Sequence, residues 1–121
     1  MKIVTYNVNG IRARLARVLE YLEEQKPDAV CLQELKCADD NLPLIEIRAA
    51  GYDGVWLGQK GFNGVAILSR ADTPLTLRKK GLSPDPADSH SRYIEAELGD
   101  VVVASLYLPN GNPVGTEKFT Y

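Results

Sequence analysis

The sequence has few of the residues that mark a secreted or zinc-binding protein. Only two cysteines, Cys31 and Cys37, and one histidine occur among its 121 residues. Two thiols are too few for a disulfide scaffold, and a zinc site would lack partner ligands. The formal net charge of −2 argues against a generally basic surface. It still allows one basic face beside an acidic metal site.

A basic leader and long apolar runs are also missing. The chain starts Met1-Lys2-Ile3-Val4, which leads directly into a strand-like segment, and no apolar stretch reaches membrane-spanning length. We therefore expect a cytoplasmic protein that does not associate with membranes. With 45% hydrophobic and 25% charged residues, the composition is typical of one ordinary globular domain, or part of one.

The first part of the chain alternates between strand-like and helix-like segments. Apolar residues recur at helical spacing from Leu15 to Leu22, and Pro27 ends this helix because proline cannot continue the hydrogen-bond ladder. Cys31 lies in an apolar run, where a thiol packs as a small hydrophobic group. The predicted elements are a strand over 2–8, the helix that Pro27 ends, a strand over 29–33 and a short helix between Pro43 and Gly51.

From Tyr52 onward, the sequence changes to short β-rich segments that are separated by glycine. Gly99-Asp100 predicts a tight hairpin because both residues tolerate positive φ. Strand, helix, strand and helix followed by a series of strands indicate an α/β sandwich. The strands are expected over 55–57, 65–68, 76–82, 93–98 and 101–107, with a Pro/Asp/Ser loop over 83–91.

Polar side chains follow three of the predicted strands. The segments are Asn7-Val8-Asn9-Gly10, Gln33-Glu34 and Tyr107-Leu108-Pro109-Asn110-Gly111. Ligands of open α/β sheets bind at the carboxyl ends of strands. Carboxylate, amide and phenol oxygens suit Mg²⁺ and phosphate. These residues therefore indicate a candidate metal and phosphate site.

Each of these residues also has a simpler explanation when it is taken alone. Asn7 or Asn9 is typical of a turn, and Glu34 of a solvated or capping charge. Tyr107 is typical of sheet packing with its hydroxyl group in water. The larger pattern around them favours the functional interpretation.

Five motifs, in order and with similar spacing, resemble the exonuclease III and abasic-site endonuclease family. They are Thr5-Tyr6-Asn7-Val8-Asn9-Gly10-Ile11-Arg12-Ala13-Arg14, Leu32-Gln33-Glu34-Leu35-Lys36, residues 59–69, residues 91–97 and Leu106-Tyr107-Leu108-Pro109-Asn110-Gly111. The resemblance implies Mg²⁺-dependent hydrolysis of DNA phosphodiesters in DNA repair, as a 3′–5′ exonuclease and abasic-site endonuclease. It also implies a four-layer α/β sandwich of two sheets flanked by helices. Residues 1–121 would be the N-terminal part of this single domain, incomplete at the C-terminus.

The resemblance also implies roles for the matched residues. Glu34 would ligate Mg²⁺, with Mn²⁺ as an alternative ion, and Asn7 would complete the metal site beside it. Tyr107 would be the catalytic residue that stabilises charge near the scissile phosphate. For Arg12 and Lys36, a solvated surface charge is the alternative explanation. The residues that match DNA-contacting or phosphate-contacting positions are Asn9, Arg12, Lys36, Phe62, Asn63, Arg92 and Asn110.

The water-activating part of the family's active site has no counterpart in the sequence. The family supplies it through a Gly-Asp-x-Asn motif and a late Ser-Asp-His motif, and neither occurs among the 121 residues. His90 is no substitute, because it stands in a polar loop just before the Arg92 motif. We therefore expect the chain to hold only part of the active site.

The expected partner is double-stranded DNA, especially DNA with abasic sites or damaged 3′ ends. One alternative is another metal-dependent phosphoesterase of the same superfamily, such as a phosphoinositide or sphingolipid phosphatase. A second alternative is a non-catalytic nucleic-acid-binding fragment. An incomplete sandwich should also expose apolar sheet surface or an unpaired edge, so we expect self-association.

Overall fold

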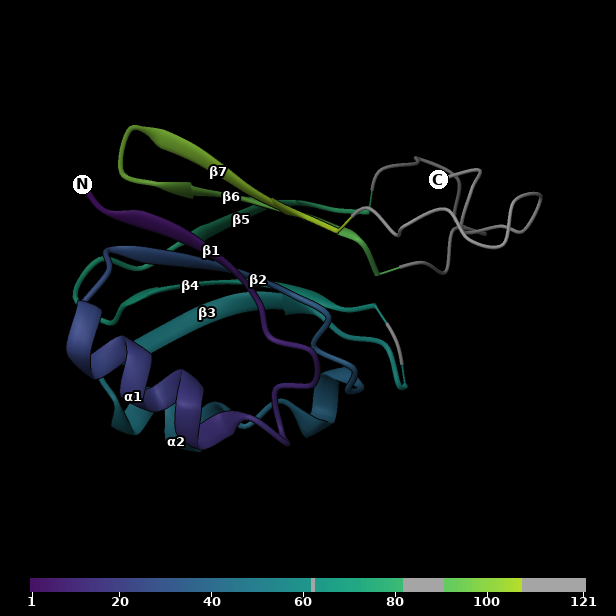
Figure 1. The fold of residues 1–121 in the computed structure, drawn as a ribbon. Coiled ribbons are helices and arrows are strands. Elements are labelled where there is room, and N and C mark those ends of the chain that lie inside the picture. The colour runs from purple at the N-terminus through teal and green to yellow at the C-terminus, as the bar shows by residue number, and fades with distance from the viewer. Residues whose placement is uncertain (62, 82–90, 108–121) are drawn as a thin grey trace.

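The computed structural model describes residues 1–61, 63–81 and 91–107. Their elements form three layers: helices, a first sheet and a second sheet (Figure 1). Helices α1 and α2 cover one face of the first sheet, and the second sheet packs on its other face. This arrangement is part of an α/β sandwich, as the sequence predicts.

The first sheet is mixed and has the strand order β1-β2-β4-β3. Strands β1 and β2 are parallel, with Asn7 opposite Gln33, and helix α1 connects them. Strand β4 is antiparallel to both of its neighbours. The strands are β1 (Ile3–Asn7), β2 (Ala29–Gln33), β3 (Tyr52–Leu57) and β4 (Val65–Arg70).

The second sheet is antiparallel, with the order β5-β6-β7. Its strands are β5 (Thr76–Lys80), β6 (Tyr93–Leu98) and β7 (Val101–Leu106). Leu98 pairs with Val101 across the predicted hairpin, where Gly99 has a φ of 58°. Buried and partly exposed residues alternate along β6, because successive side chains point to opposite faces.

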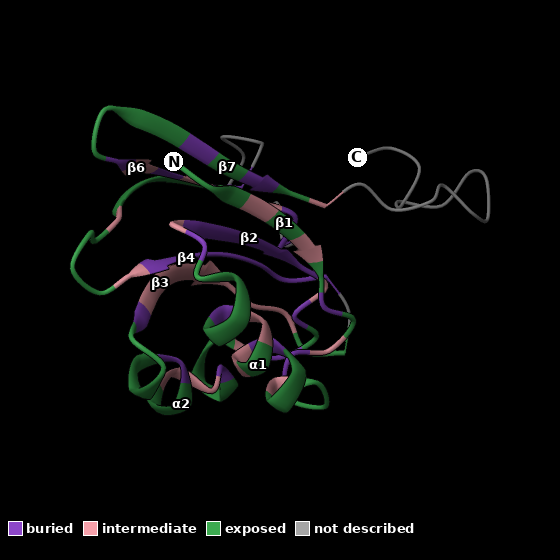
Figure 2. Ribbon diagram, turned by 60° about the vertical axis from the view of Figure 1, so that its left-hand side comes forward, coloured by how far each residue is buried: buried purple, intermediate pink, exposed green. Residues whose placement is uncertain are grey.

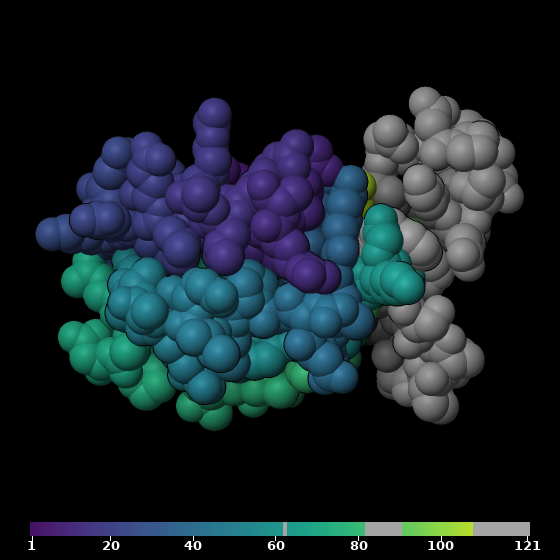
Figure 3. Space-filling view, turned by 90° about the horizontal axis from the view of Figure 1, so that it is seen from below, coloured from purple at the N-terminus to yellow at the C-terminus, as the bar shows by residue number. Residues whose placement is uncertain are grey.

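The helices follow the sequence pattern closely. Helix α1 (Leu15–Gln25) buries Val18 and Leu22, and Lys26 takes a left-handed conformation just before Pro27. Helix α2 (Leu44–Ala49) follows Pro43. A short 3₁₀ turn, η1 (Asp39–Asn41), is a feature that the sequence analysis did not predict. Seen from the helix side, the molecule shows mostly the first half of the chain, with later residues along one border (Figure 3).

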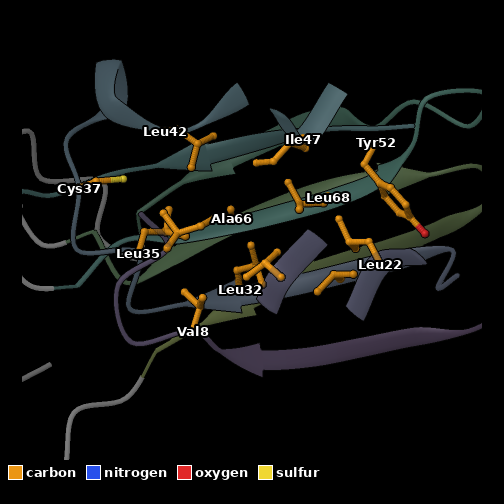
Figure 4. Packing of buried hydrophobic residues seen from close by; sticks show 13 residues of the cluster. Val8, Leu22, Leu32, Leu35, Cys37, Leu42, Ile47, Tyr52, Ala66 and Leu68 are labelled. Carbon is orange, nitrogen blue, oxygen red and sulfur yellow. The ribbon is translucent and has the colours of Figure 1, made fainter. Parts of the chain in front are cut away.

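The two central strands of the first sheet, β2 and β4, are covered on both faces, which explains why strand β2 is buried throughout (Figure 2). Val30 and Leu32 point to the helices and join the first core, which also contains Leu22 and Ile47 (Figure 4). The second core lies between the sheets. Its buried residues are Ala29, Cys31, Val65, Ile67, Ile94, Ala96, Leu98 and Val103. Burial of each valine, leucine or isoleucine side chain in this core stabilises the fold by about 1.5–3 kcal/mol.

Among the described residues, every helix is too short or too polar to span a membrane. Strand β7 pairs only with β6, and β1 only with β2, within the part of the chain that the structure describes. Strand β7 carries the exposed apolar side chains Val101, Val102 and Leu106. The apolar sheet surface that the sequence analysis expected is therefore present on β7.

Candidate active site

The carboxyl ends of β1, β2 and β7 lie at the same end of the sandwich, on the right in Figure 1. Strands β1 and β2 are parallel neighbours, so Asn7 and Glu34 leave the first sheet together. Strand β7 crosses the second sheet in the same direction and leads to Tyr107. The topology thus brings three distant parts of the sequence to one edge.

Backbone hydrogen bonds hold the two loops after β1 and β2 together. The N–H groups of Val8, Gly10 and Ile11 donate to the carbonyl oxygens of residues 33, 34 and 35, at 3.0, 2.8 and 3.0 Å. The pairing of the parallel strands therefore continues beyond the sheet. It keeps the Asn7–Asn9 segment beside Glu34.

The site concentrates unusual backbone conformations. Only five described non-glycine residues have positive φ, and four of them are predicted site residues: Asn9, Glu34, Lys36 and Asn63. Their φ angles lie between 49° and 57°. A left-handed conformation costs a residue with a Cβ about 1–2 kcal/mol, so the fold must supply compensating contacts. Such strain is typical of functional sites.

The side chains of the first two motifs contact one another. The Nζ of Lys36 donates to Oδ1 of Asn9 at 2.6 Å. The backbone N–H of Asn9 donates to Oδ1 of Asn7 at 3.2 Å. Asn7, Asn9 and Lys36 are exposed, and Glu34 is half-buried. The polar side chains of Asn7, Asn9 and Lys36 therefore lie at the surface, next to the loop that carries Glu34.

Tyr107 lies against Glu34. Its hydroxyl group is within hydrogen-bonding reach of the Glu34 carboxylate. Partial burial and then this hydrogen bond raise the pKa of Tyr107, although the nearby Arg92 guanidinium opposes the change. The phenol therefore keeps its proton at neutral pH, and it can donate a hydrogen bond to an oxygen atom.

Asn63 and Arg92 form the inner wall of the site. Both side chains are buried, with 4% and 1% of their surface exposed, and Nε of Arg92 lies 3.5 Å from Oδ1 of Asn63. The Asn63 carbonyl accepts from the N–H of Lys36 at 3.0 Å, and the Arg92 carbonyl accepts from the N–H of Tyr107 at 2.8 Å. Arg92, which the resemblance matches to a DNA-contacting or phosphate-contacting position, is thus enclosed by protein.

The remaining predicted residues are placed less closely or lie elsewhere. Arg12 is exposed and lies near Cys37. Phe62 and Asn110 lie outside the described residues, as does His90. The described geometry therefore joins the first two motifs, Asn63, Arg92 and Tyr107 at one end of the sandwich.

Comparison with known proteins identifies the family. The model of the endonuclease/exonuclease/phosphatase family matches residues 4–118. The chain belongs to this family. The resemblance inferred from the five motifs is confirmed.

Individual relatives agree with this assignment. Exodeoxyribonuclease III of Haemophilus influenzae is 36% identical over 115 residues, which cover 92% of this chain and 42% of that protein. A solved structure of a 3′ phosphatase from Neisseria bound to a product DNA hairpin superposes with a TM-score of 0.90, at 39% identity, over 100% of this chain and 46% of that one. An abasic-site (AP) endonuclease from Archaeoglobus fulgidus gives a TM-score of 0.88 at 38% identity, again over 100% of this chain and 46% of that one. The chain thus spans less than half the length of these relatives.

This endonuclease/exonuclease/phosphatase family member has donor groups that fit one kind of metal. No cluster of three or more His, Cys, Asp or Glu side chains occurs in the described ranges, which disfavours a zinc site there. Mg²⁺ needs only one or two carboxylates, together with water and substrate oxygens. The Glu34 carboxylate and the amide oxygen of Asn7, which ends the neighbouring strand, are oxygen groups of this kind.

The structure also places beside the site residues to which the sequence analysis assigned no role. Arg14 and Arg17 line a cavity of about 270 Å³ together with Tyr6, Asn7 and Asn9. Helical spacing was the available signal, because residues three apart lie on the same side of a helix. Gln33 and Ser105 also lie beside the site, and each is a polar residue on the buried face of its strand.

Proposed function

We propose that this chain carries the metal-binding and phosphate-binding part of a Mg²⁺-dependent DNA phosphodiester hydrolase of the exonuclease III type. The main supporting observation is that Asn7, Glu34 and Tyr107 converge at one edge from three strands of two sheets. The names of the relatives, which describe DNA nucleases and repair enzymes, agree with this proposal.

Each residue would have a separate role in the reaction. Glu34 and Asn7 would hold Mg²⁺, or Mn²⁺ in its place. The bound ion would neutralise the phosphate oxygens and the leaving group. Tyr107, as a neutral phenol, would donate a hydrogen bond to a phosphate oxygen on which charge develops. Asn63 and Arg92 would support this arrangement from the inner wall.

The expected substrate is double-stranded DNA with abasic sites or damaged 3′ ends. Lys36 and Asn9 are exposed beside Glu34, and Arg12 is exposed near Cys37. By the resemblance, Phe62 and Asn110 would contact the same DNA. Cations that contact phosphates release counterions, so binding should weaken as salt rises. We also propose a cytoplasmic location for this activity.

We propose that the water-activating residues are not part of this chain, which would be an incomplete N-terminal part of one domain. Neither a Gly-Asp-x-Asn nor a Ser-Asp-His sequence occurs in it. Metal binding and DNA binding would then be measurable on the chain, whereas hydrolysis would be absent. Cleavage of an abasic duplex by the 121-residue chain itself would contradict this point.

Replacing Glu34 with glutamine tests the metal site. The change removes the charge and keeps the shape, so Mg²⁺ affinity should fall about tenfold or more because the ion prefers ionised oxygen ligands. The measurement is an NMR titration of the chain with Mg²⁺, followed at residues 7–9 and 34–36.

Glu46→Gln is the matched control, because it removes the same charge from an exposed position on α2. Its Mg²⁺ affinity should equal that of the wild type. Equal affinities for Glu34→Gln and Glu46→Gln would remove Glu34 from the metal site. Tighter binding of a phosphoinositide headgroup than of an abasic duplex would favour the alternative phosphoesterase.

A further inference from the structure

A buried polar cluster joins the two sheets directly beneath the site. Gln33, at the end of β2, donates from Nε2 to Oγ of Ser105 on β7 at 3.1 Å and to Oγ1 of Thr5 on β1 at 3.0 Å. The Ser105 hydroxyl in turn donates to the Leu32 carbonyl at 2.9 Å. These bonds connect three strands across the space between the sheets.

The rest of this interface between the sheets is largely apolar. Gln33 lies on the same face of β2 as Ala29 and Cys31, which belong to the second core. Gln33 and Ser105 are themselves buried, with 8% and 1% of their surface exposed. Apolar contacts are non-directional, so the hydrophobic effect alone does not specify one offset between the sheets. Buried hydrogen bonds are directional, and breaking one costs about 1–3 kcal/mol.

The cluster is adjacent in sequence to two residues of the site. Gln33 immediately precedes Glu34, and Ser105 stands two residues before Tyr107. Tyr107 and Glu34 come from different sheets, and they must meet across this same interface. The hydrogen bond from Gln33 to Ser105 is therefore placed where it can set the position of the Tyr107 side chain relative to that of Glu34.

We propose that Gln33 and Ser105 are positioning residues, and that their hydrogen bond across the sheets fixes the Tyr107 hydroxyl relative to the Glu34 carboxylate. This inference rests on the proposed function only because that function assigns roles in the reaction to the Tyr107 hydroxyl and the Glu34 carboxylate. Neither Gln33 nor Ser105 needs to touch the metal or DNA. The Thr5 hydroxyl also lies within hydrogen-bonding distance of the Gln33 amide, 3.0 Å from Nε2 and 3.2 Å from Oε1, and so helps to hold that amide in place.

Ser105→Ala tests the positioning role, and Ser69→Ala is its matched control. Both serines are 1% exposed and point into the space between the two sheets, Ser105 from β7 and Ser69 from β4, and each donates to a backbone carbonyl, Ser69 to that of Thr73 at 2.8 Å. Ser69, however, lies at the opposite end of the sheet, where it pairs with Ala29. Both variants remove a serine hydroxyl that donates to a backbone carbonyl, but only Ser105→Ala also removes the acceptor of the Gln33 amide. Both should therefore lose stability, and only Ser105→Ala loses the bond between the sheets.

Two measurements on the full chain separate positioning from stability. In Ser105→Ala, the nuclear Overhauser effect between the Tyr107 ring and the Glu34 side chain should be lost, and Mg²⁺ affinity should fall about tenfold. Ser69→Ala should retain both. Equal behaviour of the two variants in both measurements would overturn the proposal, because the Ser105 bond would then contribute only stability.

Changes at the exposed Thr5 keep the test decisive if Ser105→Ala does not fold. Thr5→Val preserves the side-chain shape but removes the hydroxyl group that Gln33 contacts, and Thr5→Ser restores it. Weakening of the Tyr107–Glu34 contact in Thr5→Val and its recovery in Thr5→Ser would support the proposal, and no change in either would overturn it. If Mg²⁺ causes no change at Glu34 in the wild type, the proposed function fails, and the Overhauser comparison alone decides the positioning role.

Discussion

Cys31 and Cys37 are both buried free thiols. The apolar run around Cys31 predicted that its thiol packs as a small hydrophobic group, and the structure places it in the core between the sheets. Its Sγ lies 3.7 Å from the Ala104 carbonyl, within reach of a weak hydrogen bond. Burial raises the pKa of Cys31 from 9.0 to about 11, and it raises the pKa of Cys37 as well.

These thiols should therefore react slowly while the protein is folded. The thiolate is the reactive form, and a rise in pKa from 9.0 to about 11 lowers its fraction at pH 8 about a hundredfold. Labelling of Cys37→Ala with an aromatic disulfide reagent should be slow at pH 8, and it should become fast in denaturant. It should also accelerate as the pH rises toward 11. Rapid labelling of the folded variant at pH 8 would show that Cys31 is accessible.

The residue types in the sequence predicted part of the site. They could not predict the backbone conformation of Glu34 and Lys36. Asn9 is a residue type that tolerates left-handed angles, so a turn there was expected. Glu34 and Lys36 carry no such signal, and nearby residues impose their angles. The carbonyl of Glu34 accepts from Gly10, and the N–H of Lys36 donates to Asn63. Both partners are distant in the sequence, and local propensity cannot reveal them.

Among the elements, the segment that leads into β4 supports the Glu34 loop. The Gly64 carbonyl accepts from the N–H of Leu35 at 3.1 Å, and its N–H donates to the Ser91 carbonyl at 2.7 Å. Gly64 has a φ of 94°, and a Cβ there would lie 2.8 Å from Cβ of Leu35. This glycine therefore allows β4 to begin directly beside the metal-site loop.

Gly64→Ala should destabilise the protein more than Gly99→Ala. Both positions have positive φ, which costs alanine about 1–2 kcal/mol, but a Cβ on Gly99 would meet nothing within 4 Å. The clash with Leu35 adds to this cost only at Gly64, so its total should exceed about 2 kcal/mol. Chemical denaturation of both variants measures the difference. Equal losses of stability would show that the Leu35 loop moves aside freely.

The sequence predicted helices and strands correctly where the signal came from residues close together in the chain. Strand β2 and the end of α1 before Pro27 match the expectation. Strand β3 is longer than predicted, because it begins at Tyr52 and not at Val55. Gly54 hid this extension, since glycine weakens a strand signal. In this strand, glycine is required at position 54 by packing, because a Cβ there would lie 2.5 Å from the Ile67 carbonyl oxygen of β4.

At the scale of the whole molecule, the outer face of the second sheet divides into a charged and an apolar part. On β5 and β6, Arg78 forms ion pairs with Glu95 and Glu97 at 2.8 and 2.7 Å. On β7, Ala104 pairs with Glu95 and Val102 pairs with Glu97, and both of these β7 residues are exposed. An apolar strip thus runs along a strand whose outer edge has no partner strand among the described residues. Such an edge is a ready site for pairing with another chain.

We therefore expect the chain to self-associate through β7. Sedimentation velocity should show a sedimentation coefficient that rises with protein concentration. Val102→Lys should shift the equilibrium toward the monomer, because a charge on an exposed edge strand opposes pairing. Ile45→Lys is the matched control: Ile45 is 82% exposed and Val102 is 53% exposed, but Ile45 lies on α2, far from the open edge.

The comparison of the two lysine variants distinguishes specific pairing at the β7 edge from non-specific association of exposed apolar side chains. If β7 is the interface, only Val102→Lys loses association, and Ile45→Lys behaves as the wild type does. If both variants lose it equally, the contact is non-specific, and β7 has no special role. A wild-type chain that remains monomeric at every concentration would contradict self-association itself. The exposed strip on β7 would then be tolerated in water as isolated surface side chains are.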